Sequence, residues 1–513
     1  MNGYYGYTES DDQALIKVYD SVKHTEISEE FILPDYLPDI KRIIKVDTRA
    51  KIDGKFVSVG RIDYEGDVIS HVLYCDEGNH LKSVTFTAAF KDGLGISEIR
   101  DECIANLLPR TEGVICKALN PRRVSLRLRV DTDSTVWCRK SFVPELMGDY
   151  DQTEKRSRDI KVMKLICAGE GALNVSCDLE ADGSMPQIGE VVSCNTELSF
   201  YECKGADGKV LCRGEMPITV FYSSNTGETQ SYSVLCRKLP VAQVVTADGV
   251  DESYTCMARG TVDAVKINVV DNGFGERRII ELDVTYRIYL NCVGSTTVNV
   301  TEDIYAVGKN VTSEIEKECF CRFSRLYTSS IAANSVISRE ELNLTGVENV
   351  FAISAEPKIT GVVKDERSGN VKISGEARAV AMIKTDETIA TREYTVPINY
   401  EVDGSGVPND FIYNYDITCM GAKGRLDSES FYTELELQLS LMILEAEEAE
   451  VLKKAVFSPL PDLEPRPQMR FYYPSEGEDI WSIGKSLGVS VAELMEKNDV
   501  KDNLIPNVLF IPY

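Results

Sequence analysis

The stretch GKVLCRGEMPITV, from Gly208 to Val220, decides the fold because its pattern occurs three times in the chain. The related stretches are GKFVSVGRIDYEG, from Gly54 to Gly66, and GNVKISGEARAVA, from Gly369 to Ala381. Each has a glycine, a short alternating apolar run, a second glycine six residues later and another alternating run. Alternation with a period of two is typical of a strand with one buried face. The sequence therefore predicts three copies of one β unit.

The second glycines of these stretches recur at intervals of 154 and then 161 residues, at Gly60, Gly214 and Gly375. A glycine inside a strand usually marks a bulge or the close approach of another backbone. Longer alternating runs follow, such as RVSLRLRV from Arg123 to Val130, with one apolar and one charged face. That pattern is typical of antiparallel sheets with one face in water. We expect a mainly β fold of tandem antiparallel β-sandwich-like repeats.

Domain limits follow from the repeats and from changes in composition. Four prolines between Phe457 and Met469 predict an extended spacer, because proline disfavours both helix and sheet pairing. The predicted parts are an N-terminal tail (1–23), three β domains (24–150, 158–305 and 306–448), a Pro-rich linker (449–470) and a terminal module (471–513).

Composition argues against several classes of partner. The chain has 82 acidic and 56 basic residues, and its formal charge of -26 repels phosphate backbones and anionic lipid heads. No apolar run approaches the length that spans a bilayer, and the N-terminal MNGYYGYTESDDQ lacks the basic and apolar regions of a secretory signal. We expect a cytosolic protein with no nucleic-acid partner and no membrane insertion.

Catalytic and metal-binding patterns are also missing from the sequence. The 15 cysteines include no CxxC pair, and most lie in apolar alternation, so we expect reduced core thiols. The closest pair, Cys319 and Cys321, is too isolated to predict a metal site. The three histidines, His24, His71 and His80, have no ligand or triad companion at a recognisable spacing. We expect no catalytic residue, no metal, no cofactor and no enzymatic activity.

The C-terminal stretch GEDIWSIGKSLGVSVAELMEKNDV, from Gly477 to Val500, differs from everything before it. Asp479 is a good N-cap and Gly488 a good C-terminal stop for a first helix. Ser490 with Glu493 three residues later predicts a capping box that opens a second helix. Short β-like runs precede and follow these helices, which predicts a small βααβ module.

This pattern, followed by LIPNVLFIP, resembles a LysM module over about Phe471 to Pro512. Trp481 and Asn498 fall in register with that family. LysM modules usually bind N-acetylglucosamine glycans in a shallow groove between the loop after the first strand and the loop before the second. The family's Asp-Thr is Glu478-Asp479 here, and its usual Pro-Gly is Pro506-Asn507, which weakens the case for sugar binding.

Trp481 lies one position off the apolar stripe of the first helix, so it should be partly exposed on the helix flank. It can serve as an interface anchor or can seal the small core, and the sequence leaves both interpretations open. The residues that the resemblance marks for partner binding are Glu478, Asp479, Ile480, Trp481, Lys485, Pro506 and Asn507.

The first β copy, with FILPDYLPDIKRIIKVD (Phe31 to Asp47) and LNPRRVSLRLRV (Leu119 to Val130), is similar to the SPOCS domain, a domain of unknown function in spore-coat proteins. Copies two and three are assigned to it by internal similarity. SPOCS repeats before a terminal LysM module resemble the SipL-like spore-coat morphogenetic proteins.

That resemblance implies a scaffold in the mother-cell cytoplasm, at the forespore surface and in the spore coat. Its LysM module would bind the coat basement-layer morphogenetic ATPase, and its β repeats could meet other coat proteins. Linked modest contacts would then sum to high avidity. The alternatives are a LysM protein that binds peptidoglycan or N-acetylglucosamine, and an unrecognised enzyme in one β repeat.

Overall fold

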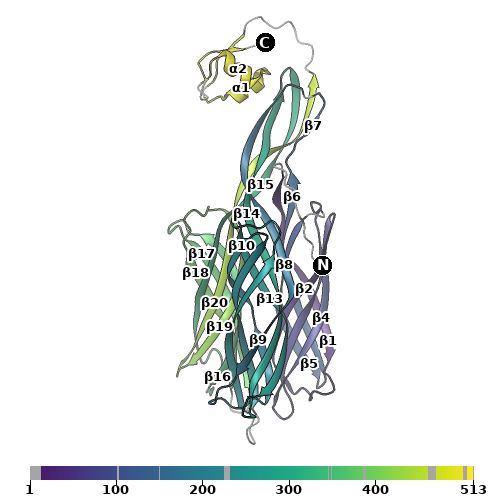
Figure 1. The fold of residues 1–513 in the computed structure, drawn as a ribbon, viewed down its shortest axis with the longest axis vertical. Coiled ribbons are helices and arrows are strands. Elements are labelled where there is room, and N and C mark those ends of the chain that lie inside the picture. The colour runs from purple at the N-terminus through teal and green to yellow at the C-terminus, as the bar shows by residue number, and fades with distance from the viewer. Residues whose placement is uncertain are drawn as a thin grey trace.

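The computed structural model describes residues 13–100, 103–149, 151–224, 231–344, 346–347, 349–384, 389–459, 470–475, 477–500 and 505–511. Within these ranges the chain is mainly β, with multiple antiparallel sheets and two short helices near its C-terminal end (Figure 1). Most strands lie in three β units that follow one another along the chain.

The first unit, residues 13–141, has two three-stranded antiparallel sheets with the strand orders β1-β6-β5 and β2-β3-β4. Side chains from both sheets, among them Ile62, Leu126 and Val130, form one buried cluster. Buried and exposed positions alternate along β6 because successive side chains of a strand point to opposite faces. The strands are β1 (Gln13–Ile32), β2 (Arg42–Ser58), β3 (Arg61–Cys75), β4 (Leu81–Gly95), β5 (Ile104–Asn120) and β6 (Arg123–Ser141).

The second unit, residues 153–306, repeats this topology, since its first strand again pairs with its last. Its sheet has the order β12-β11-β10-β13-β14-β8, with β9 also paired to β11. Among the described residues, the pairing of β10 with β13 is limited to Lys204 and Thr255, so the two halves correspond to the two sheets of the first unit. The strands are β8 (Thr153–Glu180), β9 (Glu190–Thr196), β10 (Ser199–Ala206), β11 (Lys209–Ser224), β12 (Ser231–Thr246), β13 (Thr255–Asp271) and β14 (Arg277–Ala306).

The third unit, residues 309–459, has sheets of the order β15-β20-β19 and β16-β17-β18. A short strand from the chain between the first two units, β7 (Glu145–Met147), pairs parallel with β20. The strands are β15 (Lys309–Ser338), β16 (Asn349–Lys364), β17 (Val371–Lys384), β18 (Ile389–Val402), β19 (Phe411–Leu426) and β20 (Ser430–Pro459).

The structure corrects the predicted glycine register of the first copy. Turn glycines with φ of 77°, 75° and 74° are Gly60, Gly208 and Gly369. The glycines inside the following strands are Gly66, Gly214 and Gly375. A Cβ at these positions would lie 2.0, 2.1 and 2.3 Å, respectively, from a carbonyl oxygen of the neighbouring strand. The first copy therefore uses Gly60 and Gly66, and the prediction of Gly54 and Gly60 was wrong. Gly54 misled because it lies the same six residues before Gly60.

Two of the predicted domain limits also differ from the structure. β1 begins at Gln13, inside the segment 1–23 that we expected as a tail, and β20 continues to Pro459, past the expected start of the linker at 449. The rest of that linker, residues 460–469, lies outside the described residues. The acidic run from Glu445 to Glu450 resembles a connector in sequence, but it lies inside β20.

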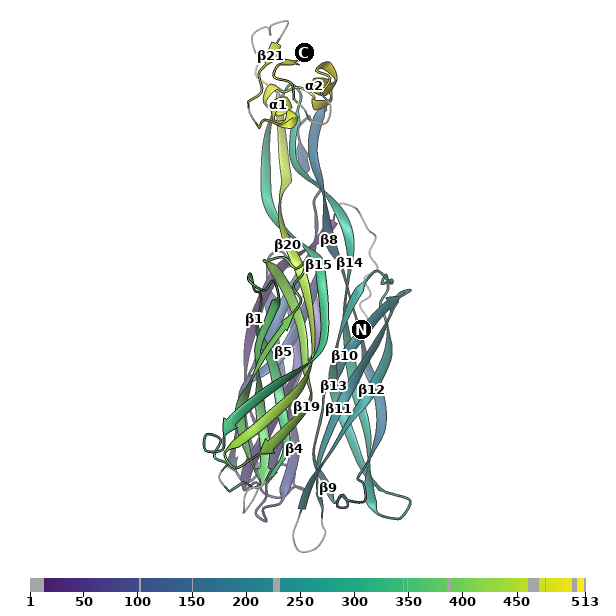
Figure 2. The ribbon, with the colours of Figure 1, turned by 90° about the vertical axis from the view of Figure 1, so that its left-hand side faces the viewer.

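A narrow part of the fold is a stalk formed by the ends of four long strands, at residues 153–162, 297–306, 309–320 and 449–459 (Figures 1 and 2). Its interior is apolar, with Val298, Phe320 and Val451 in one cluster and Ile304, Leu452 and Phe457 in another. Both views show the two helices at the outer end of the stalk. The stalk therefore holds the C-terminal part of the chain away from the three-unit body.

Two cysteine pairs depart from the expectation of reduced thiols throughout. Disulfides join Cys103, directly before β5, to Cys138 of β6, and Cys256 of β13 to Cys292 of β14. Strand register places Cys256 opposite Cys292, and sequence spacing alone cannot reveal such a register. Free thiols are found at Cys116, Cys167, Cys177, Cys194, Cys203, Cys212, Cys236, Cys319, Cys321 and Cys419.

Candidate functional site

The terminal module, residues 470–511, contains β21 (Arg470–Tyr472), α1 (Ile480–Leu487), α2 (Val491–Lys497) and β22 (Leu509–Ile511). β21 and β22 pair as antiparallel strands. Ile483, Leu494 and Leu509 are fully buried in a small cluster whose members all belong to the module. The module therefore has a core of its own.

The two helices begin differently. Asp479 caps α1 by accepting a hydrogen bond from the Ser482 amide at 2.8 Å, and Gly488 ends it with φ of 64°, which confirms both predicted signals. Ser490 precedes α2 but makes no side-chain capping bond, so the predicted capping box was wrong. Its hydroxyl donates instead to Glu154 of β8 at 2.5 Å. The Ser490 side chain therefore bonds to the stalk and does not cap its own helix.

Two side chains of α1 converge on one carboxylate of the stalk. Trp481 donates from Nε1 to Oδ2 of Asp303 at 2.9 Å, and Nζ of Lys485 lies 2.7 Å from both carboxylate oxygens. Positions 481 and 485 are four apart, so they share one face of the helix. This face of α1 is therefore docked on the end of β14.

Tyr305, two residues after Asp303, completes the contact. Its ring meets the Trp481 ring edge-on with the centroids 5.0 Å apart, and its hydroxyl donates to the Val489 carbonyl at 2.8 Å. A Cβ at position 484 would lie 2.7 Å from that hydroxyl oxygen, so only glycine allows this approach. Tyr305 therefore makes an edge-on aromatic contact, a buried hydrogen bond and a close packing contact with Gly484.

The neighbouring strand β8 extends the same surface. Strand register sets Arg156 opposite Asp303 and Glu154 opposite Tyr305. Nη1 of Arg156 lies 3.2 Å from Oδ2 of Asp479, at the N-terminus of α1. We call Glu154, Arg156, Asp303 and Tyr305 the stalk-tip patch. The residues of α1 and its N-cap that face it, Asp479, Trp481, Gly484 and Lys485, form the module face.

Docking changes the acidity of the groups involved. Burial alone would raise the pKa of Asp303, but the hydrogen bonds from Lys485 and Trp481 outweigh it and lower the pKa below the ordinary value of 3.8. The stabilisation that the ionised Asp303 gives to the contact is therefore fully present above pH 3.8, and it is lost as the pH falls through the lowered pKa of Asp303. Burial raises the pKa of Tyr305, so its hydroxyl remains a donor at neutral pH.

The structure divides the seven predicted site residues into four groups. Asp479, Trp481 and Lys485 lie in the docked contact, whereas Ile480 is buried in the module core. The Glu478 carboxylate accepts from the Tyr472 hydroxyl and the Ser475 amide, within the module. Pro506 is half-buried and Asn507 exposed, in the loop before β22.

Sequence reasoning missed the stalk-tip patch altogether. Its four residues lie in strands more than 160 positions before the module, and nothing in their local sequence distinguishes them from ordinary strand residues. The ladder of β14 and β8 shifts register between Thr301 and Asp303, as a bulge would cause. A bulge re-aims side chains, but the sequence around Asp303 carries no glycine that would have signalled it.

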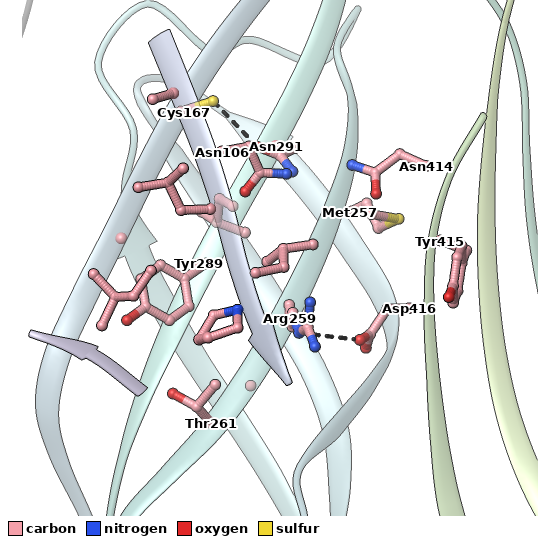
Figure 3. Close-up of a pocket in the computed structure, with 18 of the residues that line it drawn as sticks. Asn106, Cys167, Met257, Arg259, Thr261, Tyr289, Asn291, Asn414, Tyr415 and Asp416 are labelled. Carbon is pink, nitrogen blue, oxygen red and sulfur yellow. Dashed lines mark hydrogen bonds and ion pairs between the residues drawn. The ribbon is translucent and has the colours of Figure 1, made fainter. Parts of the chain in front are cut away.

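A cavity of about 1560 Å³ lies where the three units meet (Figure 3). Charged groups there link one unit to another: Nε of Arg259 lies 3.4 Å from the Asp416 carboxylate, and Arg110 donates to the Tyr415 hydroxyl at 2.9 Å. Burial raises the pKa of Asp416, outweighing the opposing effects of Arg259 and Arg110. These contacts hold the units together.

Within the described ranges, no group of three or more histidine, cysteine, aspartate or glutamate side chains is placed to hold a metal ion. The histidines lie in the first unit, where His24 contacts Asp131 at 2.7 Å and His71 contacts Thr85 at 2.8 Å. No helix in the part of the chain that the structure describes is long and apolar enough to cross a membrane.

Fold and site together define a multi-unit antiparallel β protein whose terminal module is docked, through an aromatic and polar contact, on a stalk. Residues 187–270, in the second unit, match the family model described as SipL, SPOCS domain. The match supports a SipL-like relationship and suggests a sporulation-related protein. It falls on the second copy, whereas the sequence motifs pointed first to the first copy. No curated protein and no solved structure matches the chain.

Proposed function

We propose that this protein is a non-catalytic scaffold in spore coat assembly. Its terminal module, which resembles LysM, binds the coat basement-layer morphogenetic ATPase at the forespore surface, in the mother-cell cytoplasm. The observation that carries this proposal is the chemistry of the module face. Trp481 and Lys485 already engage a carboxylate and an aromatic ring of polypeptide, which supports protein rather than sugar as the ligand.

The three β units support the scaffold role. Their long strands form an extended body in an acidic chain, and the stalk carries the module away from that body (Figure 2). Other coat proteins would meet the β units, and the sum of linked contacts would raise the total affinity. The proposed function needs no cofactor, because any energy for assembly comes from the ATPase.

Peptidoglycan binding is the second candidate. It would use the groove of the family, which Glu478, Pro506 and Asn507 flank; the Glu478 carboxylate bonds within the module and Asn507 is exposed. A glycan could therefore reach these loops while the module is docked.

The test compares the full chain with a chain that ends at Pro459, where β20 ends. Each is titrated with purified coat basement-layer ATPase and, separately, with muropeptides. We expect the full chain to bind the ATPase and the shortened chain to lose that binding. Equal ATPase binding by both chains would contradict the proposal, and saturable muropeptide binding without ATPase binding would establish the second candidate.

A further inference from the structure

The docked contact is built from groups that recognise a specific chemistry. Two donors on one face of α1 meet a single carboxylate, and the Trp481 ring meets an aromatic ring two residues further along the same strand. Residues two apart in a strand point to the same side, so Asp303 and Tyr305 present their side chains together. The module face therefore recognises a carboxylate beside an aromatic hydroxyl on a strand.

The contact between the module and the stalk is also of a kind that can separate while both parts stay folded. The module core and the two stalk clusters share no residue, so separation leaves each core intact. The bonds across the contact are mainly polar, and the Lys485 side chain is 42% exposed. Interfaces between parts of one chain with this character commonly separate.

We propose that the stalk-tip patch occupies the module's recognition face in cis, and that the partner displaces it by presenting the same chemistry. The partner surface would carry an acidic side chain next to a tyrosine or a similar aromatic on an exposed strand. This inference rests on the proposed function, in which the module binds a protein. It differs from what net charge alone implies, because -26 favours a basic or neutral partner surface.

Competition in cis lowers the apparent affinity of the module for an external partner, and the size of this effect can be calculated. A tethered patch acts at a high effective concentration, and only the open fraction of molecules can bind an external partner. Weakening the patch without touching the module raises that fraction. We expect about tenfold tighter apparent binding if the open fraction rises from about a tenth to nearly all.

The experiment uses the full chain with Asp303→Asn, with Tyr305→Ala and with both, and purified coat basement-layer ATPase as the probe. Asp159→Asn is the matched control, because Asp159 is an exposed carboxylate of the same stalk that contacts Asn299. Acrylamide quenching of tryptophan fluorescence reports the opening, since the other tryptophan, Trp137, is only 6% exposed.

The proposal expects the patch variants to show more quenching and about tenfold tighter ATPase binding, with the control unchanged. More quenching without tighter binding would overturn it, as would unchanged quenching. Thermal unfolding checks that each variant folds, and Glu154→Gln weakens the patch from the other strand if Tyr305→Ala does not fold. Should the full chain and the chain ending at Pro459 bind the ATPase equally, the proposed function itself would fail.

Discussion

Gly484 is the residue on which the docked geometry depends most sharply. An added Cβ would lie 2.7 Å from the Tyr305 hydroxyl oxygen and 3.0 Å from the Val489 carbonyl oxygen. Contacts this short force the neighbours to move, at a cost of about 1–3 kcal/mol. We expect Gly484→Ala to loosen docking and increase acrylamide quenching of Trp481.

Two further variants sharpen this test. Tyr305→Phe removes the nearest atom, so it should recover part of the docking in the Gly484→Ala background. Ser486→Ala is the control, because Ser486 is an exposed residue of the same helix whose hydroxyl donates to the Ile483 carbonyl within that helix. Quenching that is equal in Gly484→Ala and in the unchanged chain would rule out the close approach.

At the scale of single residues, the sequence predicted the helices of the module but not the contact between the module and the stalk. Asp479 and Gly488 are recognisable because capping is local chemistry. Trp481 was placed correctly on a helix flank, with its role left open. Asp303 and Tyr305 could not be found, because their importance depends on tertiary proximity that no local pattern encodes.

At the scale of elements, the strand glycines define the repeat. At Gly66 a Cβ would lie 2.0 Å from the Lys51 carbonyl oxygen, whereas at Gly54 the nearest atom would be a Glu65 side-chain carbon at 3.5 Å. We expect Gly66→Ala to lower the free energy of unfolding by about 1–3 kcal/mol or more, and Gly54→Ala to change it by about 0.5 kcal/mol at most.

Chemical denaturation of both variants measures the difference. It also tests the corrected register, since the register that the sequence first suggested makes Gly54, not Gly66, one of the repeat glycines. A larger loss of stability in Gly54→Ala than in Gly66→Ala would restore that first register.

The strands were predictable because alternation survives in any sheet with one wet face, as the burial pattern of β6 shows. The strand register, the strand order and the stalk could not be predicted from the sequence. Pairing β1 with β6 joins residues about a hundred positions apart, and alternation fits many such pairings. The limits of β1 and β20 were misjudged because both strands continue into segments whose composition looks like that of a tail or a linker.

At the scale of the whole molecule, the body, the stalk and the module have separate tasks. The three units are linked by contacts such as those of Arg259 with Asp416, so the body is built as one assembly. The stalk sets the height of the module above it (Figure 1). An acidic body held at a distance from the module would not prevent Lys485 from meeting an acidic partner, because salt screens charges beyond about 8–10 Å.

The most direct test of protein recognition by the module face is calorimetric titration of the coat basement-layer ATPase into the full chain and into Trp481→Ala. Tyr473→Ala is the matched control, since Tyr473 is an aromatic of the same module that is 72% exposed. With Asp303→Asn present in both chains, so that the stalk-tip patch no longer competes in cis, we expect Trp481→Ala to weaken binding by about 30-fold, as for an anchor of about 2 kcal/mol, with the unfolding of the β units unchanged. Binding that survives Trp481→Ala as well as it survives Tyr473→Ala would contradict recognition through this face.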